Sequence, residues 1–329
     1  MNGMATTRRG LLALGGGGLV LARGGAARAE DWPRRPIRLV VAFAPGGATD
    51  VQGRILAERL SAELGQAVVV ENRPGASGII GTEAVARAAP DGYTLLLGSV
   101  TTHAVNVPLY GTRLPYDPVR DFVAVSRTNT GYNLLAIHPS VPARSVPELI
   151  ALAKAKPGAL AYGSGGNGTS THLAGELFRM MAGVDILHVP FRSTAPATTA
   201  LTAGQIQMMF DTSVSAMPLM RDGQVRVLAT TAPQRQPALP ELPTVAETLP
   251  GFTMDTWSGL YAPAGTPRPI VDRIDAATRA ALAQPDLLRR FADLGAIAFP
   301  AGPEEFAAFQ AAEIARWTKV VRDAGITAE

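Results

Sequence analysis

The sequence predicts an α/β fold made of two lobes with a pocket between them. Short apolar runs rich in β-branched residues alternate with helical patterns, which is typical of βαβ units on a parallel sheet. Each half of the chain also contains a glycine turn that leads from a strand into a helix. Two α/β lobes with such turns would face each other across a ligand pocket.

The first 29 residues have the pattern of an export signal. Arg8 and Arg9 precede an apolar, glycine-rich stretch at 11–22, which is too short to span a membrane. A small-x-small motif ends at Ala29, so we predict cleavage just before Glu30. The paired arginines resemble a twin-arginine signal, and the general secretory route stays open as the alternative.

The composition limits the partners of the mature chain. The formal net charge falls from +3 to −1 when the four arginines of residues 1–29 are removed, and no basic run remains that would indicate nucleic acid or an anionic membrane. The chain has no cysteine, and its four histidines have no metal-ligand spacing, so we predict no metal site. No later apolar run of about 18 residues predicts a membrane span.

The first α/β unit is predicted over residues 37–98. We expect strands at 37–43, 67–71 and 94–98, with helices at 51–64 and 79–89. Prolines interrupt the following stretch, 100–130, which we expect to be irregular.

A second α/β unit is predicted from about residue 131. Its expected strands are 134–137, 160–162, 186–189, 206–210 and 225–229, and its main helices are 146–156 and 171–181. A proline-rich connection at 232–252 leads to a strand at 257–262 and to helices at 267–282, 286–294 and 303–324.

The first glycine turn is a candidate anion site. Gly46 and Gly47 allow a tight strand-to-helix turn, and the free N–H groups of the following helix would face a ligand together with its positive dipole end. A turn without a ligand is the alternative. Asp50 would either cap its own helix or hydrogen-bond a polar group of the ligand.

The second glycine turn, residues 163–168, has the G-x-G-x-x-G spacing of dinucleotide sites. However, the next acid, Asp185, begins the following strand instead of ending it. The turn is also rich in side-chain donors, which favours a small anion over a dinucleotide or a purely structural turn. His172 and Asp211, which lie at the start of a helix and the end of a strand, are further candidates, with packing and loop roles as alternatives.

Signatures of enzymes are otherwise missing from the sequence. It contains no G-x-x-x-x-G-K-[ST], H-E-x-x-H or G-x-S-x-G motif. We therefore predict no catalytic residue and no cofactor.

Several blocks of the sequence together resemble one family. They are residues 36–50, 70–78, 91–96, 162–168 and 259–263, and they are similar to segments of the Bug-type receptors, the periplasmic solute-binding components of tripartite tricarboxylate transporters. The resemblance spans nearly the whole mature chain.

This resemblance implies a two-lobed periplasmic binding protein fold (Venus flytrap, type II-like), with two doubly wound lobes and a hinge. Residues 30–130 and 253–329 would form lobe one, and residues 131–252 lobe two. It also implies a monomeric periplasmic receptor that holds a small mono- or dicarboxylate and serves membrane transporter subunits. The alternatives are an orphan receptor that signals through a partner protein and an exported dinucleotide-dependent enzyme.

The resemblance also implies which residues contact the ligand. They are Phe43, Gly46, Gly47, Asp50 and Ser99 in lobe one, and Ser164, Asn167, Thr169, Ser170, His172 and Asp211 in lobe two. The chain departs from the family where Ser193-Thr194 replaces a usual glycine turn and where Thr212 follows Asp211 in place of asparagine. These departures bear on the identity of the ligand.

Overall fold

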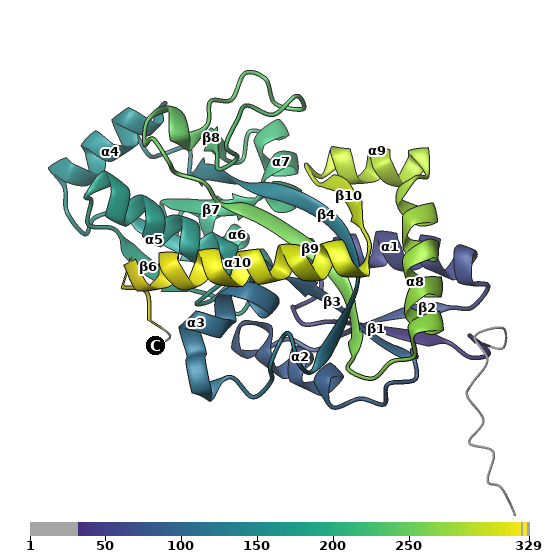
Figure 1. Cartoon of the computed structure of the whole chain (residues 1–329). Coiled ribbons are helices and arrows are strands. Elements are labelled where there is room, and N and C mark those ends of the chain that lie inside the picture. The colour runs from purple at the N-terminus through teal and green to yellow at the C-terminus, as the bar shows by residue number, and fades with distance from the viewer. Residues whose placement is uncertain (1–31, 324, 328–329) are drawn as a thin grey trace, which may run out of the picture. The chain divides into compact units, whose positions relative to one another are not determined.

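Two β-sheets that share one strand organise the fold (Figure 1). The computed structural model describes residues 32–323 and 325–327, and the described residues from Pro33 onward form one compact unit. The expected export signal and its cleavage site lie outside the described residues. The shared strand is β4 (Phe122–Ile137), which pairs with β9 and β10 up to Tyr132 and with β7 and β8 from Asn133 onward.

The first sheet has the order β2-β1-β3-β9-β4, and β10 also pairs with β4. The strands β1, β2 and β3 are parallel, whereas β9 runs antiparallel to β3 and β4. The bounds are β1 (Ile37–Val41), β2 (Val68–Asn72), β3 (Thr94–Ser99), β9 (Asp255–Pro263) and β10 (Ile297–Ala301).

The second sheet continues from β4 in the order β7-β5-β6, and β8 also pairs with β4. Here β5 is parallel to β6 and β7, while β7 and β8 are antiparallel to β4. The bounds are β5 (Ala161–Ser164), β6 (Leu187–Pro190), β7 (Met208–Thr212) and β8 (Arg226–Thr230).

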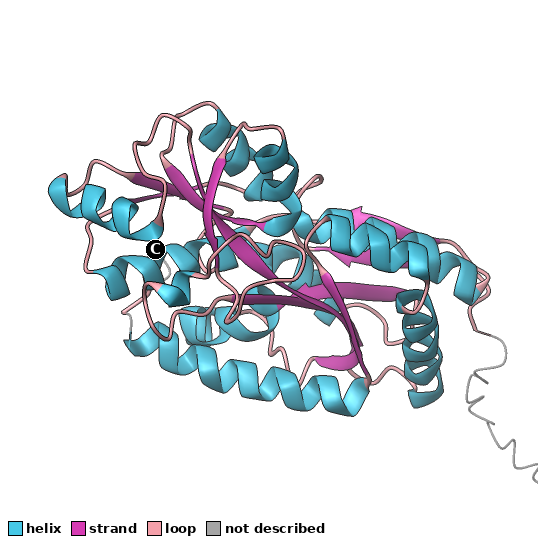
Figure 2. Ribbon diagram, turned by 90° about the horizontal axis from the view of Figure 1, so that it is seen from above, coloured by secondary structure: helices cyan, strands magenta, loops and turns pink. Residues whose placement is uncertain are grey.

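Helices lie on both faces of the strands (Figure 2). They are α1 (Ala48–Leu64), α2 (Ile79–Ala86), α3 (Asn106–Tyr110), α4 (Val146–Ala155), α5 (Ser170–Ala182), α6 (Thr194–Thr202), α7 (Ser213–Arg221), α8 (Arg268–Leu282), α9 (Pro285–Asp293) and α10 (Pro303–Asp323), with short turns η2 (Ala76–Gly78), η3 (Thr101–Val105), η4 (Gly111–Arg113) and η5 (Val245–Glu247). None of these described helices is both long and apolar enough to cross a membrane.

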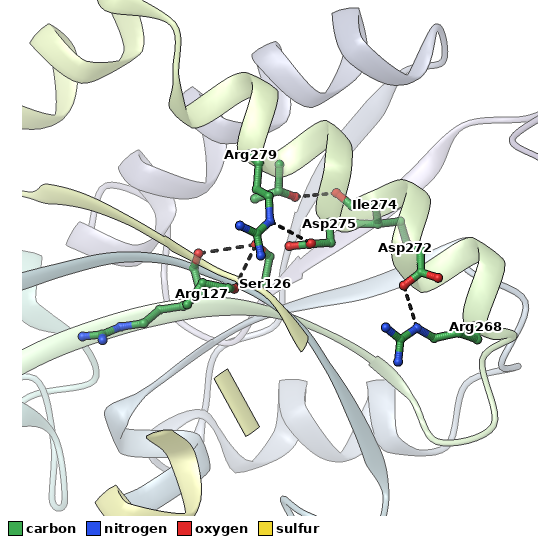
Figure 3. A network of polar contacts seen from close by, with 9 residues as sticks. Ser126, Arg127, Arg268, Asp272, Ile274, Asp275 and Arg279 are labelled. Atoms are coloured by element: carbon green, nitrogen blue, oxygen red, sulfur yellow. Dashed lines mark hydrogen bonds and ion pairs between the residues drawn. The ribbon is translucent and has the colours of Figure 1, made fainter. Parts of the chain in front are cut away.

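Two helices show why the sequence folds this way locally. In α1, Ile55, Leu56 and Leu60 are buried on one face, and the helix ends at Gly65, whose φ of 69° suits glycine. In α8, the exposed face carries ion pairs one turn apart, Arg268 with Asp272 and Arg279 with Asp275 (Figure 3). Such exposed pairs stabilise a helix by only about 0.2–0.5 kcal/mol each, so burial of the apolar faces matters more.

The long helix α10 joins the C-terminal part of the chain to the first sheet. Glu313 on α10 is buried and accepts hydrogen bonds from the indole N–H groups of Trp257 on β9 (2.9 Å) and Trp317 (3.3 Å). Phe306 on α10 packs edge-on against Trp257, with ring centroids 5.8 Å apart. These contacts with α10 hold the Trp257 side chain in place on β9.

The predicted strands and long helices are confirmed, but the structure differs from the sequence-based expectations in four places. Residues 122–130 form the first part of β4 instead of an irregular segment, and residues 297–301 form a strand that the sequence pattern did not indicate. Residues 101–110 are helical. The first sheet is mixed and not wholly parallel, because β9 is inserted antiparallel between β3 and β4.

Candidate ligand-binding cleft

One cleft is lined by residues from both sheets and from the loops at their strand ends. It encloses about 750 Å³ of space between atoms, with open solvent at its mouth included. Five of the expected contact residues line it: Phe43, Gly47, Ser99, Thr169 and Ser170. Whether they bind a ligand stays a prediction.

The turn between β1 and α1 supplies main-chain N–H groups to the cleft. Gly47 is the N-cap of α1, with extended backbone (φ −76°, ψ 166°) and no side chain to cap the helix. The next two residues, Ala48 and Thr49, also line the cleft, and their N–H groups lie in the first helical turn, where no partner exists within the helix. The positive end of the α1 dipole therefore meets the cleft.

Asp50 and Gly46 hold this turn together and do not line the cleft, so a direct contact with a ligand stays a prediction for both residues. The Asp50 carboxylate is buried and accepts hydrogen bonds from the N–H of Gly46 (2.9 Å), from Arg54 (3.1 Å) and from Asn72 (2.8 Å). Burial raises the pKa of Asp50, but the hydrogen bonds from Arg54, Gly46 and Asn72 outweigh it and lower that pKa overall. All its hydrogen-bonding capacity serves the fold of the turn.

The loop between β5 and α5 supplies a second helix N-terminus. Gly165, Thr169, Ser170 and Thr171 line the cleft. Thr169 is the N-cap of α5, and its Oγ1 accepts a hydrogen bond from the N–H of His172 at 3.4 Å. The N–H groups of Ser170 and Thr171 lie in the first turn, so α5 presents its positive end to the cleft as α1 does.

Two other expected contacts in this loop, Ser164 and Asn167, do not line the cleft. The Ser164 hydroxyl bonds His188 Nε2 (2.7 Å) and accepts from the N–H of Gly166 (3.1 Å), which closes the turn. Asn167 lies outside the lining and its carbonyl accepts a hydrogen bond from the Ser77 hydroxyl. Neither residue lines the cleft, so the role of both as ligand contacts stays a prediction.

His172 also serves the loop. Its Nδ1 accepts a hydrogen bond from the N–H of Gly168 at 3.1 Å, and its ring lies 4.3 Å from that of His188. Burial lowers the pKa of His172 to about 4, so the ring is neutral at pH 7 and Nε2 carries the proton. His172 is not among the residues that line the cleft, and its role as a ligand donor stays a prediction.

Two further helix N-termini face the cleft. Ser193 and Thr194 at the start of α6, and Thr212, Ser213 and Val214 at the start of α7, line it. No side chain caps either helix. Sequence analysis noted residues 193, 194 and 212 only as departures from a family pattern, and the signal that could have found them is their position directly after strands β6 and β7.

Asp211 lies behind this wall and does not line the cleft. It is fully buried and accepts a hydrogen bond from the N–H of Thr212 at 2.7 Å. Its Oδ2 is 2.9 Å from Thr198 Oγ1, and Thr198 Oγ1 is also 2.9 Å from the carbonyl of Thr194. Burial raises the pKa of Asp211 to about 7, against the effect of these hydrogen bonds.

The floor of the cleft is a row of neutral polar side chains on the first sheet. Ser99 on β3 pairs in register with Ser258 on β9, which pairs with Asn129 on β4. All three line the cleft, as does Gln52 on α1, whose Oε1 accepts from Asn129 Nδ2 at 3.4 Å. Sequence analysis missed Gln52, Asn129 and Ser258 because a polar residue inside a strand or on a helix face carries no motif.

The cleft combines positive helix ends with a lining that holds no charged side chain among the described residues. Four helices, α1, α5, α6 and α7, begin at it, and each is the next helix after a strand in the chain. Main-chain N–H groups and helix dipoles stabilise anions. Across the part of the chain that the structure describes, no group of three His, Asp or Glu residues is placed to hold a metal ion.

Comparison with known families decides what kind of protein this is. The model of the tripartite tricarboxylate transporter family receptor, TctC, matches residues 53–326. The chain belongs to this receptor family. BugT of Bordetella pertussis is 37% identical to the receptor over 313 residues, which cover 94% of this chain and 96% of BugT.

Solved structures agree with the family and the fold. R. palustris Rpa4515 with adipate is 39% identical to the receptor, with a TM-score of 0.88, and the match covers 90% of this chain and 99% of that one. MatC (Rpa3494) from Rhodopseudomonas palustris with bound malate is 37% identical, with a TM-score of 0.84, over 88% and 100% of the two chains. The receptor has the two-lobed α/β fold of periplasmic solute-binding proteins, as predicted, and it is a member of a solute-binding family.

Proposed function

We propose that the receptor captures a small mono- or dicarboxylate in the cleft and delivers it to the membrane subunits of a tripartite tricarboxylate-type transporter. The observation that carries this proposal is the convergence of the α1, α5, α6 and α7 N-termini on a cleft without charged side chains. Oriented main-chain N–H groups suit a carboxylate, because they donate hydrogen bonds and carry partial positive charge. The bound adipate and malate of two similar proteins support the ligand class.

The contact residues of the proposal follow from the geometry. The lining includes Gly47, Ala48, Thr169, Ser170 and Thr194. In the proposal they supply donors from both lobes, with lobe one formed by residues 30–130 and 253–329 and lobe two by residues 131–252. Four or five hydrogen bonds to a charged group contribute about 1.5–3 kcal/mol each. This exceeds the lower end of the association cost of about 4–15 kcal/mol, so micromolar affinity is attainable.

Isothermal titration calorimetry of the mature protein tests the ligand class. Succinate, malate and adipate should bind, and the corresponding neutral diamides should not, because only the acids carry the charge that helix N-termini stabilise. Binding of NAD(P) without binding of any carboxylate would instead favour a dinucleotide-dependent enzyme.

A proline substitution tests the role of one main-chain N–H. Ala48 is the first residue of α1, a position that accepts proline, and Gly47 before it already has the extended backbone that proline requires. Ala48→Pro should therefore leave the helix intact, remove one N–H from the cleft and weaken carboxylate binding about tenfold. Ala48→Val is the matched control, because it adds similar bulk and keeps the N–H. Equal losses in the two variants would show that bulk, and not the N–H, matters.

Transport needs a separate experiment in cells. Deletion of the gene should abolish uptake of the solute that the purified receptor binds, and restoring the wild-type gene should recover it. Unchanged uptake would favour a receptor that signals through a partner protein.

A further inference from the structure

The hydroxyl groups of Ser99 and Ser193 stand out among the polar groups of the cleft. Ser99 is 7% exposed and Ser193 is 3% exposed, and both line the cleft. Neither Oγ atom has a hydrogen-bond partner among the described residues. Buried hydroxyl groups are normally paired, because an unpaired one loses its interactions with water without replacement.

The two hydroxyls belong to different parts of the cleft. Ser99 ends β3 and lies at one end of the neutral row that continues through Ser258 and Asn129 on the first sheet. Ser193 is the N-cap of α6, which follows β6 of the second sheet, yet its side chain makes no capping hydrogen bond. An N-cap serine usually satisfies its own helix, so a Ser193 hydroxyl that does not is available to a ligand.

The chemistry of these groups differs from that of the helix N-termini. Main-chain N–H groups only donate, and they suit the carboxylate oxygens. A serine hydroxyl both donates and accepts, so it suits a neutral oxygen substituent as well. Gly165 leaves room for this arrangement, because a Cβ on it would lie 3.0 Å from the N of Thr194, next to Ser193.

We propose that Ser99 and Ser193 determine specificity by binding an oxygen substituent of the ligand, so that the receptor prefers hydroxy- or oxo-substituted carboxylates to unsubstituted ones of the same length. The inference rests on the proposed function and adds the ligand's neutral group to it. Each serine hydroxyl can donate to or accept from a ligand hydroxyl, and each can donate to a ligand carbonyl oxygen. An unsubstituted methylene chain would leave both serines unpaired, which disfavours such ligands.

Calorimetric titration with matched ligand pairs tests this proposal. The pairs are succinate against malate and oxaloacetate, and glutarate against 2-hydroxyglutarate. The wild type should bind a substituted acid about tenfold or more tightly than its unsubstituted partner, which is the discrimination expected of one good hydrogen bond. The affinities for malate and oxaloacetate, compared with each other, show whether the site prefers a hydroxy or an oxo substituent.

Alanine variants test whether Ser99 and Ser193 cause the preference for substituted acids. Ser99→Ala and Ser193→Ala should each reduce the ratio of affinities toward one, mainly by weakening binding of the substituted acid. Thr199→Ala, on the exposed face of α6 and outside the cleft, is the matched control and should preserve the ratio. Far-ultraviolet circular dichroism of each variant checks that it is folded.

Two results would overturn the inference while leaving the proposed function intact. One is equal affinity of the wild type for both members of each pair. The other is an unchanged ratio in both serine variants, which would mean that ordered water satisfies these hydroxyls. If no carboxylate bound at all, the proposed function would fail, and this inference with it.

Discussion

The hydrogen bonds of Asp211, a residue behind the cleft wall, indicate its protonation state. Thr198 has one hydroxyl proton, but its Oγ1 lies 2.9 Å from two acceptors, the Thr194 carbonyl and Asp211 Oδ2. A protonated Asp211 resolves this conflict, because it can donate to Thr198 while its Oδ1 accepts from the Thr212 N–H. The raised pKa of about 7 agrees with a carboxyl group that is about half protonated at pH 7 and neutral at lower pH in the folded protein.

Asp211→Asn should therefore remove a pH dependence of stability. Because the pKa of Asp211 rises from 3.8 to about 7 on folding, its favourable contribution is complete below pH 3.8 and is lost as the pH rises to about 7. Asparagine mimics the neutral acid at every pH. In urea denaturation, the free energy of unfolding of the variant relative to that of the wild type should increase between pH 4 and 7, by as much as about 4 kcal/mol. A difference that does not change with pH would contradict this account.

The pKa of Asp50 shifts in the opposite direction to that of Asp211. Its lowered pKa means that the contribution to stability is present above the ordinary value of 3.8 and is lost as the pH falls below it. Asp50→Ala leaves the Gly46 N–H without its acceptor and removes one of the two acceptors of the Asn72 amide, so it should lower the free energy of unfolding at pH 7 by about 1–3 kcal/mol. Asp50→Asn should lose less. Urea denaturation at pH 7 and pH 3 measures both, and a loss for Asp50→Ala that is as large at pH 3 would argue against the ionised carboxylate.

Sequence analysis found the right loops but not the direction of each side chain. The glycine turns, Thr169 and Ser170 were identified from their position between a strand and a helix, and they do line the cleft. Asp50, Ser164, His172 and Asp211 looked equally suited from their chemistry, yet their side chains form hydrogen bonds within the protein. Which partner such a side chain takes depends on tertiary distances that no local pattern contains.

At the scale of elements, the N-cap of α5, Thr169, can be tested with a pair of matched substitutions. The Thr169 hydroxyl contacts the His172 N–H, the Gly166 carbonyl and the Thr171 hydroxyl. Thr169→Ala should lower the free energy of unfolding by about 1 kcal/mol, the usual cost of a lost N-cap, and should weaken carboxylate binding because the first turn loosens. Thr169→Ser keeps the hydroxyl and is the control. Chemical denaturation and calorimetry measure the two effects, and an alanine variant equal to the serine variant would disprove the role.

The strand β4 shows why an element can escape prediction. Its first part, 122–130, contains Ser126, Arg127, Thr128 and Asn129, which are buried although polar. Burial is possible because these groups are paired or stacked: Thr128 Oγ1 bonds the Ser258 carbonyl at 3.0 Å, and the Arg127 guanidinium lies 3.8 Å from the centre of the Phe309 ring. A sequence pattern that expects apolar alternation in strands cannot recognise such a segment.

At the scale of the whole molecule, the two sheets are connected by more than the shared strand. The Ser77 hydroxyl of η2 donates to the carbonyl of Asn167 in the loop after β5, and Asn106 Nδ2 donates to the Ser77 carbonyl at 3.1 Å. Ser77 does not line the cleft. We expect this contact to stabilise the conformation in which the N-termini of α1 and of α5, α6 and α7 face one ligand. A ligand shifts the equilibrium toward the conformation that it binds better, so stabilising that conformation should strengthen binding.

Ser77→Ala should thus weaken ligand binding from outside the cleft. Loss of one hydrogen bond, worth about 0.5–1.5 kcal/mol, would reduce the affinity about two- to tenfold through the population of the competent state. Calorimetry measures the affinity, and Ser140→Ala, in an exposed loop far along the chain from η2, serves as control. Full affinity in Ser77→Ala would show that this contact does not change on binding.

A crystal structure of the mature protein with bound malate or adipate tests the central claim, that main-chain N–H groups at helix N-termini hold the carboxylate. The account predicts carboxylate oxygens about 2.7–3.2 Å from first-turn N–H nitrogens of α1 and of at least one of α5, α6 and α7, directly or through one water. A carboxylate held by arginine or lysine side chains, or bound outside the cleft, would contradict it.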